Sequence, residues 1–190
     1  MKFLKAVTTV GFFTLLSRVF GFIRDILIAS VLGAGGVADA FFLALRLPNL
    51  FRRLFAEGAL AAAFVPIFSN ILELNGRDQA RAFAEQVFSA LILILAFFVA
   101  FIELVMPWVM IGLAPGFAGV PGKMELATEM SRIAFPYILF ISLVAMQSGI
   151  LNALGRFAAP AAAPILFNLV LIISLLGFSD HLNTPGHVLS

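Results

Sequence analysis

Cysteine is absent from the sequence and charged residues are scarce. Without cysteine, the 190-residue chain has neither a disulfide framework nor a thiolate metal site. Charged residues make up 12% of it, against about 25% in an average soluble domain. The net charge of +2 gives no support for a nucleic-acid partner. No zinc-ligand spacing, nucleotide-binding glycine loop or nucleophile elbow is present, so we expect no metal, no cofactor and no enzyme activity.

Apolar residues are abundant where charge is scarce. They make up 62% of the chain and include 22 phenylalanines, whereas soluble domains average about 45–50% apolar residues. The composition therefore predicts an integral membrane protein. Lys2 and Lys5 before an apolar run also suit a cleavable signal peptide, but Arg18, Arg24 and Asp25 interrupt that run and favour a retained first helix.

Five apolar stretches are long enough to cross a bilayer, which takes about 20 helical residues. They are residues 6–32, 37–74, 84–113, 128–154 and 160–178. In the second stretch, Pro48 and Pro66 each remove a backbone donor, so we expect that helix to be kinked. The polar residues 179–190 are expected to form an external loop. Together these features predict an all-α, polytopic helical bundle.

The basic residues between the stretches predict the orientation of the chain. Lys and Arg favour the cytoplasmic side of a membrane. If the N-terminus is cytoplasmic, one basic loop residue, Lys123, lies outside, and five lie inside: Lys2, Lys5, Arg77, Arg81 and Arg156. We therefore expect a cytoplasmic N-terminus.

Five arginines lie within the first two apolar stretches: Arg18, Arg24, Arg46, Arg52 and Arg53. A charge at the bilayer centre costs about 2.5–3.5 kcal/mol on insertion scales, so such residues usually face a protein interior or a wet cavity. Anchoring the chain does not require them. The arginines therefore predict a membrane protein that meets an anionic ligand within the membrane.

The charges of the first stretch form one polar stripe. Ser17 and Arg24 are seven residues apart and share a line along the helix, and Arg18 and Asp25 share the neighbouring line, about 100° further round. Gly21 lies between the two lines. Because lipid does not solvate such a stripe, we expect it to face protein or water.

The second stretch repeats this arrangement. Intervals of seven relate Asp39, Arg46 and Arg53, and the remaining polar residues are Asn49, three after Arg46, Arg52, and Glu57, four after Arg53. Intervals of three, four and seven place side chains on one face of a helix. A polar face is therefore predicted here too.

Two interpretations of these charges stay open. Arginine keeps its charge when desolvated and binds phosphate with two parallel donors, so two or three arginines suit a diphosphate. Alternatively the charges pair internally, Arg24 with Asp25 or Asp39 and Arg53 with Glu57. Because five arginines face four acids in these stretches (Asp25, Asp39, Glu57 and Glu73), the ligand is favoured for Arg18, Arg24 and Arg52. For Arg46 and Arg53 the two interpretations are balanced, and Asn168 is expected to form a helix–helix hydrogen bond.

Several segments resemble the MurJ/MviN lipid II flippase family. They are SRVFGFIRD at 17–25, ADAFF at 38–42, LPNLFRRLFAEGA at 47–59 and AFVP at 63–66, with the less distinctive NALGRF at 152–157. This family belongs to the multidrug/oligosaccharidyl-lipid/polysaccharide exporter superfamily, whose members have two helical lobes. The resemblance implies that the chain supplies the first five helices of the N-terminal lobe and that its partner is a C-terminal lobe of the same parent chain.

The resemblance also implies roles for single residues. Arg18, Arg24 and Arg52 match the cavity arginines that engage the substrate diphosphate, and Asp39 and Asn49 match positions implicated in function. The implied activity is transfer of lipid II, a polyprenyl-diphosphate-linked peptidoglycan precursor, across the bacterial cytoplasmic membrane by alternating access. The alternatives are a flippase for another polyprenyl-diphosphate oligosaccharide, a cation-coupled drug exporter of the same superfamily, and a non-transporting membrane scaffold.

Overall fold

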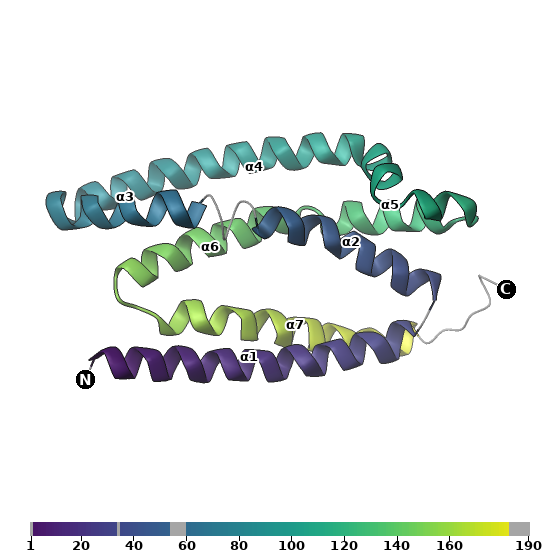
Figure 1. Ribbon diagram of the computed structural model, residues 1–190, viewed down its shortest axis with the longest axis horizontal. Helices are drawn as coiled ribbons and strands as arrows, with labels where there is room; N and C mark the ends of the chain where they lie inside the picture. The colour runs from purple at the N-terminus through teal and green to yellow at the C-terminus, as the bar shows by residue number, and fades with distance from the viewer. Residues whose placement is uncertain (1, 34, 54–59, 183–190) are drawn as a thin grey trace. The chain divides into compact units, whose positions relative to one another are not determined.

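The computed structural model describes residues 2–33, 35–53 and 60–182, and within these ranges the chain is helical and contains no strand (Figure 1). A short 3-10 helix, η2 (Pro115–Gly119), joins two of the α-helices. The α-helices are α1 (Lys2–Leu32), α2 (Gly36–Arg52), α3 (Leu60–Asn75), α4 (Arg77–Leu113), α5 (Lys123–Ala134), α6 (Tyr137–Ala153) and α7 (Ala158–Leu182).

Membrane-crossing length and apolar composition occur together in three parts of the described chain. They are Arg77–Leu113, Lys123–Ala153 and Ala158–Gly177, which contain most or all of the third, fourth and fifth expected stretches. Helix α1 covers the first stretch, and α2 and α3 cover the described parts of the second. The prediction of an all-α, multi-pass membrane protein is confirmed.

Prolines differ in how they affect these helices. Helices α2 and α3 continue through Pro48 and Pro66, and residues 54–59 between the two helices lie outside the described part of the chain. Pro136, in contrast, separates α5 from α6 within the expected stretch 128–154. Pro136 has no N–H to donate to the backbone carbonyl of Arg132, so one α-helical hydrogen bond is missing there. The next two backbone bonds are of the three-residue kind, from Ile138 N–H to the Phe135 carbonyl and from Leu139 N–H to the Pro136 carbonyl.

Helix α4 is longer than the stretch 84–113 predicted. A single residue, Gly76, separates α4 from α3. Gly76 has a φ of 84°, which residues other than glycine rarely adopt. The 37 residues of α4 extend over about 55 Å, well beyond the roughly 30 Å hydrocarbon core of a bilayer. The expected connection at Arg77 and Arg81 is therefore the first part of the helix, where Arg81 pairs with Glu85 at 2.7 Å.

Helix α7 also passes an expected boundary. The sequence predicts a loop over 179–190, but the α7 backbone remains helical to Leu182. The loop prediction is therefore wrong for residues 179–182. The rest of that segment, 183–190, lies outside the described residues.

Two compact units make up the chain. The first combines residues 1–38 with 155–190, and α1 lies alongside α7 in it (Figure 1). The second is residues 39–154 and contains nearly all of α2 together with α3 to α6. The first unit thus brings together segments more than a hundred residues apart, whereas the second is continuous in sequence.

Aromatic, methionine and aliphatic side chains form the core of the second unit. Phe135, which is fully buried, has its ring centroid 5.9 Å from those of both Phe51 and Phe98. A second cluster stacks Phe64 against Phe68 and Phe83, at 5.5 and 5.7 Å. These contacts join α2, α4 and the α5–α6 junction at one place, and α3 and α4 at the other.

Candidate anion-binding site

Arg24 has the most polar contacts of the arginines in the described part of α1. Its Nε and Nη2 donate to Oδ1 of Asp25 at 3.0 and 2.7 Å, and its Nη1 donates to Oδ1 of Asn168 at 2.8 Å. These bonds use three of the five N–H groups of the guanidinium. The Arg24 side chain is 25% exposed and that of Asp25 is 64% exposed, so the pair lies at the edge of the α1–α7 contact.

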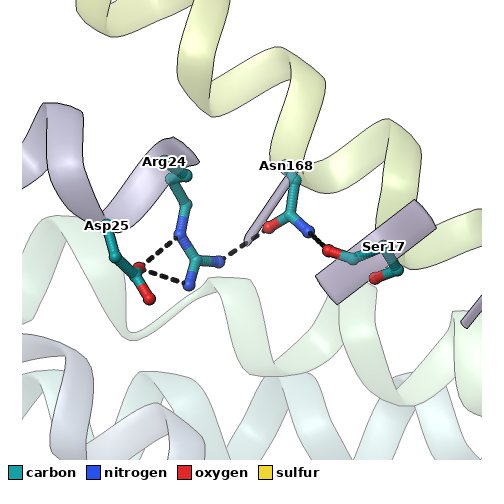
Figure 2. A network of polar contacts seen from close by, with 4 residues as sticks. All are labelled: Ser17, Arg24, Asp25 and Asn168. Atoms are coloured by element: carbon teal, nitrogen blue, oxygen red, sulfur yellow. Dashed lines mark hydrogen bonds and ion pairs between the residues drawn. The ribbon is translucent and has the colours of Figure 1, made fainter. Parts of the chain in front are cut away.

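Asn168 forms hydrogen bonds with α1 at two positions along the same face of that helix (Figure 2). Its Nδ2 donates to the Ser17 carbonyl at 3.1 Å, while its Oδ1 accepts from Arg24. Between the two contacts lies Gly21, where an added Cβ would be 3.6 Å from Nδ2 of Asn168. Asn168 is 5% exposed. The helix–helix hydrogen bond expected of Asn168 is therefore confirmed, and the line Ser17–Gly21–Arg24 faces α7.

The second line of the α1 stripe is open in this unit. Arg18 is exposed and, among the described residues, has no hydrogen-bond or ion-pair partner. Asp25 accepts from Arg24 through Oδ1. The predicted stripe thus divides into a line that meets protein and a line that does not.

Helix α2 has a sharp division between a buried and an exposed face. The buried face contains Leu43, Ala44, Leu47 and Pro48. The exposed face carries three of the predicted polar residues, Asp39, Arg46 and Asn49, and Arg53, directly after the end of the helix, is exposed too. Intervals of seven and three therefore place Asp39, Arg46 and Asn49 on one face, as helical geometry requires.

Arg52 differs from its neighbours on α2. It is half-buried, whereas Arg46 and Arg53 are exposed. Glu57, the expected partner of Arg53, lies outside the described residues, so that pair stays a prediction. Arg52 is thus the α2 arginine that lies closest to the protein interior of its unit.

Asp39 has a partner that the sequence did not indicate. Nζ of Lys123, the first residue of α5, donates to Oδ2 of Asp39 at 2.7 Å and lies 4.2 Å above the ring centroid of Phe117. Asp39 is in the first turn of α2, and the thirteen residues from Asp39 to Arg52 extend over about 20 Å of helix. Asp39 and Arg52 therefore lie near opposite ends of α2.

Arg24 forms one of the internal pairs that the sequence suggested, the pair with Asp25. This pair and the bond to Asn168 do not use every donor of the guanidinium, because two of its five N–H groups are left for a further acceptor. Arg18 and Arg24 belong to the first unit, and Arg46, Arg52 and Arg53 to the second. Each set is thus a feature of its own unit.

Acidic and histidine side chains do not gather into a metal site: the part of the chain that the structure describes has no group of three or more. One acid is partly enclosed instead. Oε1 of Glu103, on α4, is buried and has no hydrogen-bond partner within the described ranges. Buried polar atoms are usually paired, so Glu103 is an exception in the second unit.

The fold defines a multi-pass α-helical membrane protein, and charged side chains within such helices are typical of a transporter. The model of the family described as "Lipid II flippase MurJ" matches residues 28–189. The chain belongs to this lipid II flippase MurJ family.

Curated relatives agree with this assignment. A probable lipid II flippase MurJ of Rhizobium tropici is 49% identical over 179 residues, which cover 92% of the chain and 33% of the relative. The lipid II flippase MurJ of Burkholderia cenocepacia is 41% identical over an alignment that covers the whole chain and 37% of the relative. The chain thus spans about a third of the length of these relatives.

Proposed function

We propose that this chain forms part of a lipid II flippase and that arginines of α1 and α2 bind the diphosphate of the substrate. The observation that carries the proposal is the family match over residues 28–189, in a chain that has five arginines within its first two apolar stretches. The relatives are named as lipid II flippases. A diphosphate is the part of such a substrate that arginines recognise best.

The polar face of α1 supplies the first contacts in this proposal. Arg24 has two N–H groups beyond those that Asp25 and Asn168 occupy, and Arg18 is exposed. An incoming phosphate oxygen would replace or supplement the exposed Asp25 carboxylate. Because an exposed ion pair contributes only about 0–1 kcal/mol, releasing Asp25 is a small obstacle.

Helix α2 and the residue after it supply the rest. The half-buried Arg52 binds the diphosphate directly in this proposal, while the exposed Arg46, Asn49 and Arg53 support the site as a polar surface along which the head group moves. Glu57, which lies outside the described residues, is proposed as a further supporting residue. Asp39 is paired with Lys123 about 20 Å along the helix from Arg52. We assign Asp39 a supporting role at that end of the helix rather than a contact with the same phosphate.

The proposed setting is the bacterial inner membrane with a cytoplasmic N-terminus. Arg77 begins α4 and Lys123 follows its other end, which suits opposite sides of a bilayer. The excess of basic residues at the Arg77 side supports a cytoplasmic location for that end. A C-terminal lobe of the parent chain would complete the cavity, in keeping with the greater length of the relatives.

The proposed activity is transport without a covalent step. Lipid II would bind from the cytoplasmic leaflet with its lipid tail in the bilayer, and rocking of two lobes would expose the head group on the other side. Such a change requires that the substrate bind the two conformations with different affinity. The arginines provide that difference if they surround the diphosphate in one conformation and separate in the other.

Native mass spectrometry of the full-length gene product that contains residues 1–190 tests this proposal. The purified protein is offered lipid II and an O-antigen-type polyprenyl diphospholipid in competition. We expect selective retention of lipid II, and its loss in Arg24→Ala and in Arg52→Ala. Arg81→Ala is the matched control, because Arg81 is an exposed arginine at the start of α4.

Each other outcome has a defined meaning. If the protein retains both lipids equally and the two variants retain neither, the proposed diphosphate site is supported, and a flippase of broader specificity is favoured. Binding that is indifferent to both substitutions would contradict the arginine site. No binding of either lipid by the unsubstituted protein would reject the flippase assignment and favour the drug exporter or the scaffold.

A further inference from the structure

We propose that Asn168 of α7 is a positioning residue for Arg24, which sets the direction in which the guanidinium meets an anionic ligand. The inference rests on the proposed function, since it concerns the same diphosphate site. It adds a residue from the fifth apolar stretch to a site otherwise built on the first two. The Asn168 side chain does not itself contact the ligand in this proposal.

The amide of Asn168 has a fixed orientation because its two ends have different partners (Figure 2). Nδ2 faces the Ser17 carbonyl at 3.1 Å, and Oδ1 faces Nη1 of Arg24 at 2.8 Å. A rotation by 180° would bring a donor against the guanidinium and an acceptor against a carbonyl. The amide therefore presents its oxygen to Arg24 and to nothing else on α1.

Burial makes this arrangement specific. Asn168 is 5% exposed, and a buried amide is costly unless its donor and acceptor are both satisfied. Gly21 lies beside the amide, and a Cβ there would be at ordinary contact distance, 3.6 Å, from the amide nitrogen. A leucine or valine at position 168 would still pack against α1, but it would leave Nη1 of Arg24 without its hydrogen-bond acceptor.

The neutrality of the amide matters for an anionic ligand. Asn168 accepts a hydrogen bond from Arg24 without adding a negative charge, so the cation keeps its attraction for phosphate. The carboxylate of Asp25 is 64% exposed and therefore screened and displaceable. Asn168 and Asp25 thus hold the guanidinium from different directions, and of the two only Asp25 competes electrostatically with the ligand.

A double-mutant cycle tests the inference on the full-length gene product in detergent, with undecaprenyl diphosphate as the probe. We expect Asn168→Leu to raise the dissociation constant about tenfold, the size of a lost hydrogen bond to a charged group. In the Arg24→Ala background the same substitution should change it by less than about twofold, because the partner is already gone. Asn152→Leu, at an exposed asparagine of α6, is the matched control.

Asn168→Ala provides a second test if the leucine variant does not fold. It removes the amide without adding bulk or charge at the contact between α1 and α7, and we expect weaker binding of the probe only where Arg24 is present. An equal loss of affinity in both backgrounds, or no loss in either, would overturn the positioning role while leaving the flippase proposal intact. Failure of the unsubstituted protein to bind the probe would reject the proposed function and this inference together.

Discussion

In the first unit, Arg24 is held against α7 by Asn168, whereas in the second unit Arg46 on α2 and Arg53, directly after α2, lie exposed. All three belong to polar patterns with seven-residue spacing. The difference lies in what packs against each helix. Helix α1 presents its polar line to a neighbour that carries a matching amide. Helix α2 packs its apolar line within its unit, and its polar line is exposed there, with Asp39 paired to Lys123.

The two units also differ in how they are held together. In the first unit the buried residues include Ile28 and Ile165 together with the polar Asn168. The second unit has two hydrophobic clusters in which aromatic, methionine and aliphatic side chains pack together. Lipid is as apolar as leucine, so helices in a membrane associate through close packing and hydrogen bonds. The first unit combines the long contact between α1 and α7 with the hydrogen bonds of the buried Asn168, and the second unit is built around its two clusters.

The largest expected effect is on the packing of the second unit. Phe135→Ala removes a fully buried ring that contacts Phe51 and Phe98. We expect a loss of about 3 kcal/mol in the free energy of unfolding, at the lower end of the usual range because the surrounding lipid is also apolar. Denaturant titration of the full-length protein in bicelles measures it. Phe140→Ala, at a ring that is 66% exposed, should change stability little.

Overpacking of the α3–α6 contact should have the next largest effect. A Cβ at Gly149 would lie 2.9 Å from Cγ2 of Val65, so Gly149→Leu forces the helices or the valine to move. We expect destabilisation of about 2 kcal/mol, measured by the same titration. Val65→Ala should restore part of the loss in the double variant. If it restores nothing, the close approach of these two helices is not the cause.

The comparison between the two polar patterns gives a smaller effect. Arg24→Met leaves Oδ1 of the buried Asn168 without its donor, and we expect a loss of about 1–2 kcal/mol. Arg46→Met, at an exposed position, should change the free energy of unfolding by less than about 0.5 kcal/mol. Thermal unfolding of both variants checks the contrast. Equal destabilisation would mean that α2 contacts more than its own unit at Arg46.

The smallest expected effect concerns the pair between α2 and α5. Lys123→Met removes the ion pair with Asp39, in which the acid is 60% exposed. Exposed pairs contribute about 0–1 kcal/mol, so we expect a loss of about 0.5 kcal/mol that falls further at high salt. A double-mutant cycle with Asp39→Asn measures the coupling. A coupling that is insensitive to salt would show that the pair is more enclosed than its exposure indicates.

Particular residues show how far the sequence predicts the fold. The run of apolar residues and Gly33 place the end of α1 at Leu32, where Gly33 adopts a φ of 64°. The apolar stretch 84–113 begins seven residues after the start of α4. The reason is that Arg77, Asp78 and Arg81 interrupt the apolar run without interrupting the helix. Hydropathy reports the part of a helix that lies in lipid, and the hydrogen-bonded helix itself continues as far as the backbone allows.

The candidate site shows a similar limit. The sequence predicts that Asp39, Arg46, Asn49 and Arg53 share a face. The structure places the first three on one exposed face of α2, and Arg53, directly after the helix, is also exposed. The sequence also identifies Asn168 as a helix–helix contact. Its partners on α1, and the pairing of Lys123 with Asp39 across 84 positions, have no signal in local spacing. Short-range periodicity fixes angles around one helix and carries no information about which helix lies opposite.

The sequence by itself thus determined the membrane-embedded helical class, the resemblance to a family, and the angular position of each charge on its helix. Those properties depend on composition and on the 3.6-residue period, which are local. Only the tertiary structure decided that the Ser17–Arg24 line faces α7, that Asn168 joins the two, and that Arg18 is exposed within its own unit. These facts depend on the packing of segments more than a hundred residues apart, where burial determines which of several possible polar partners is satisfied.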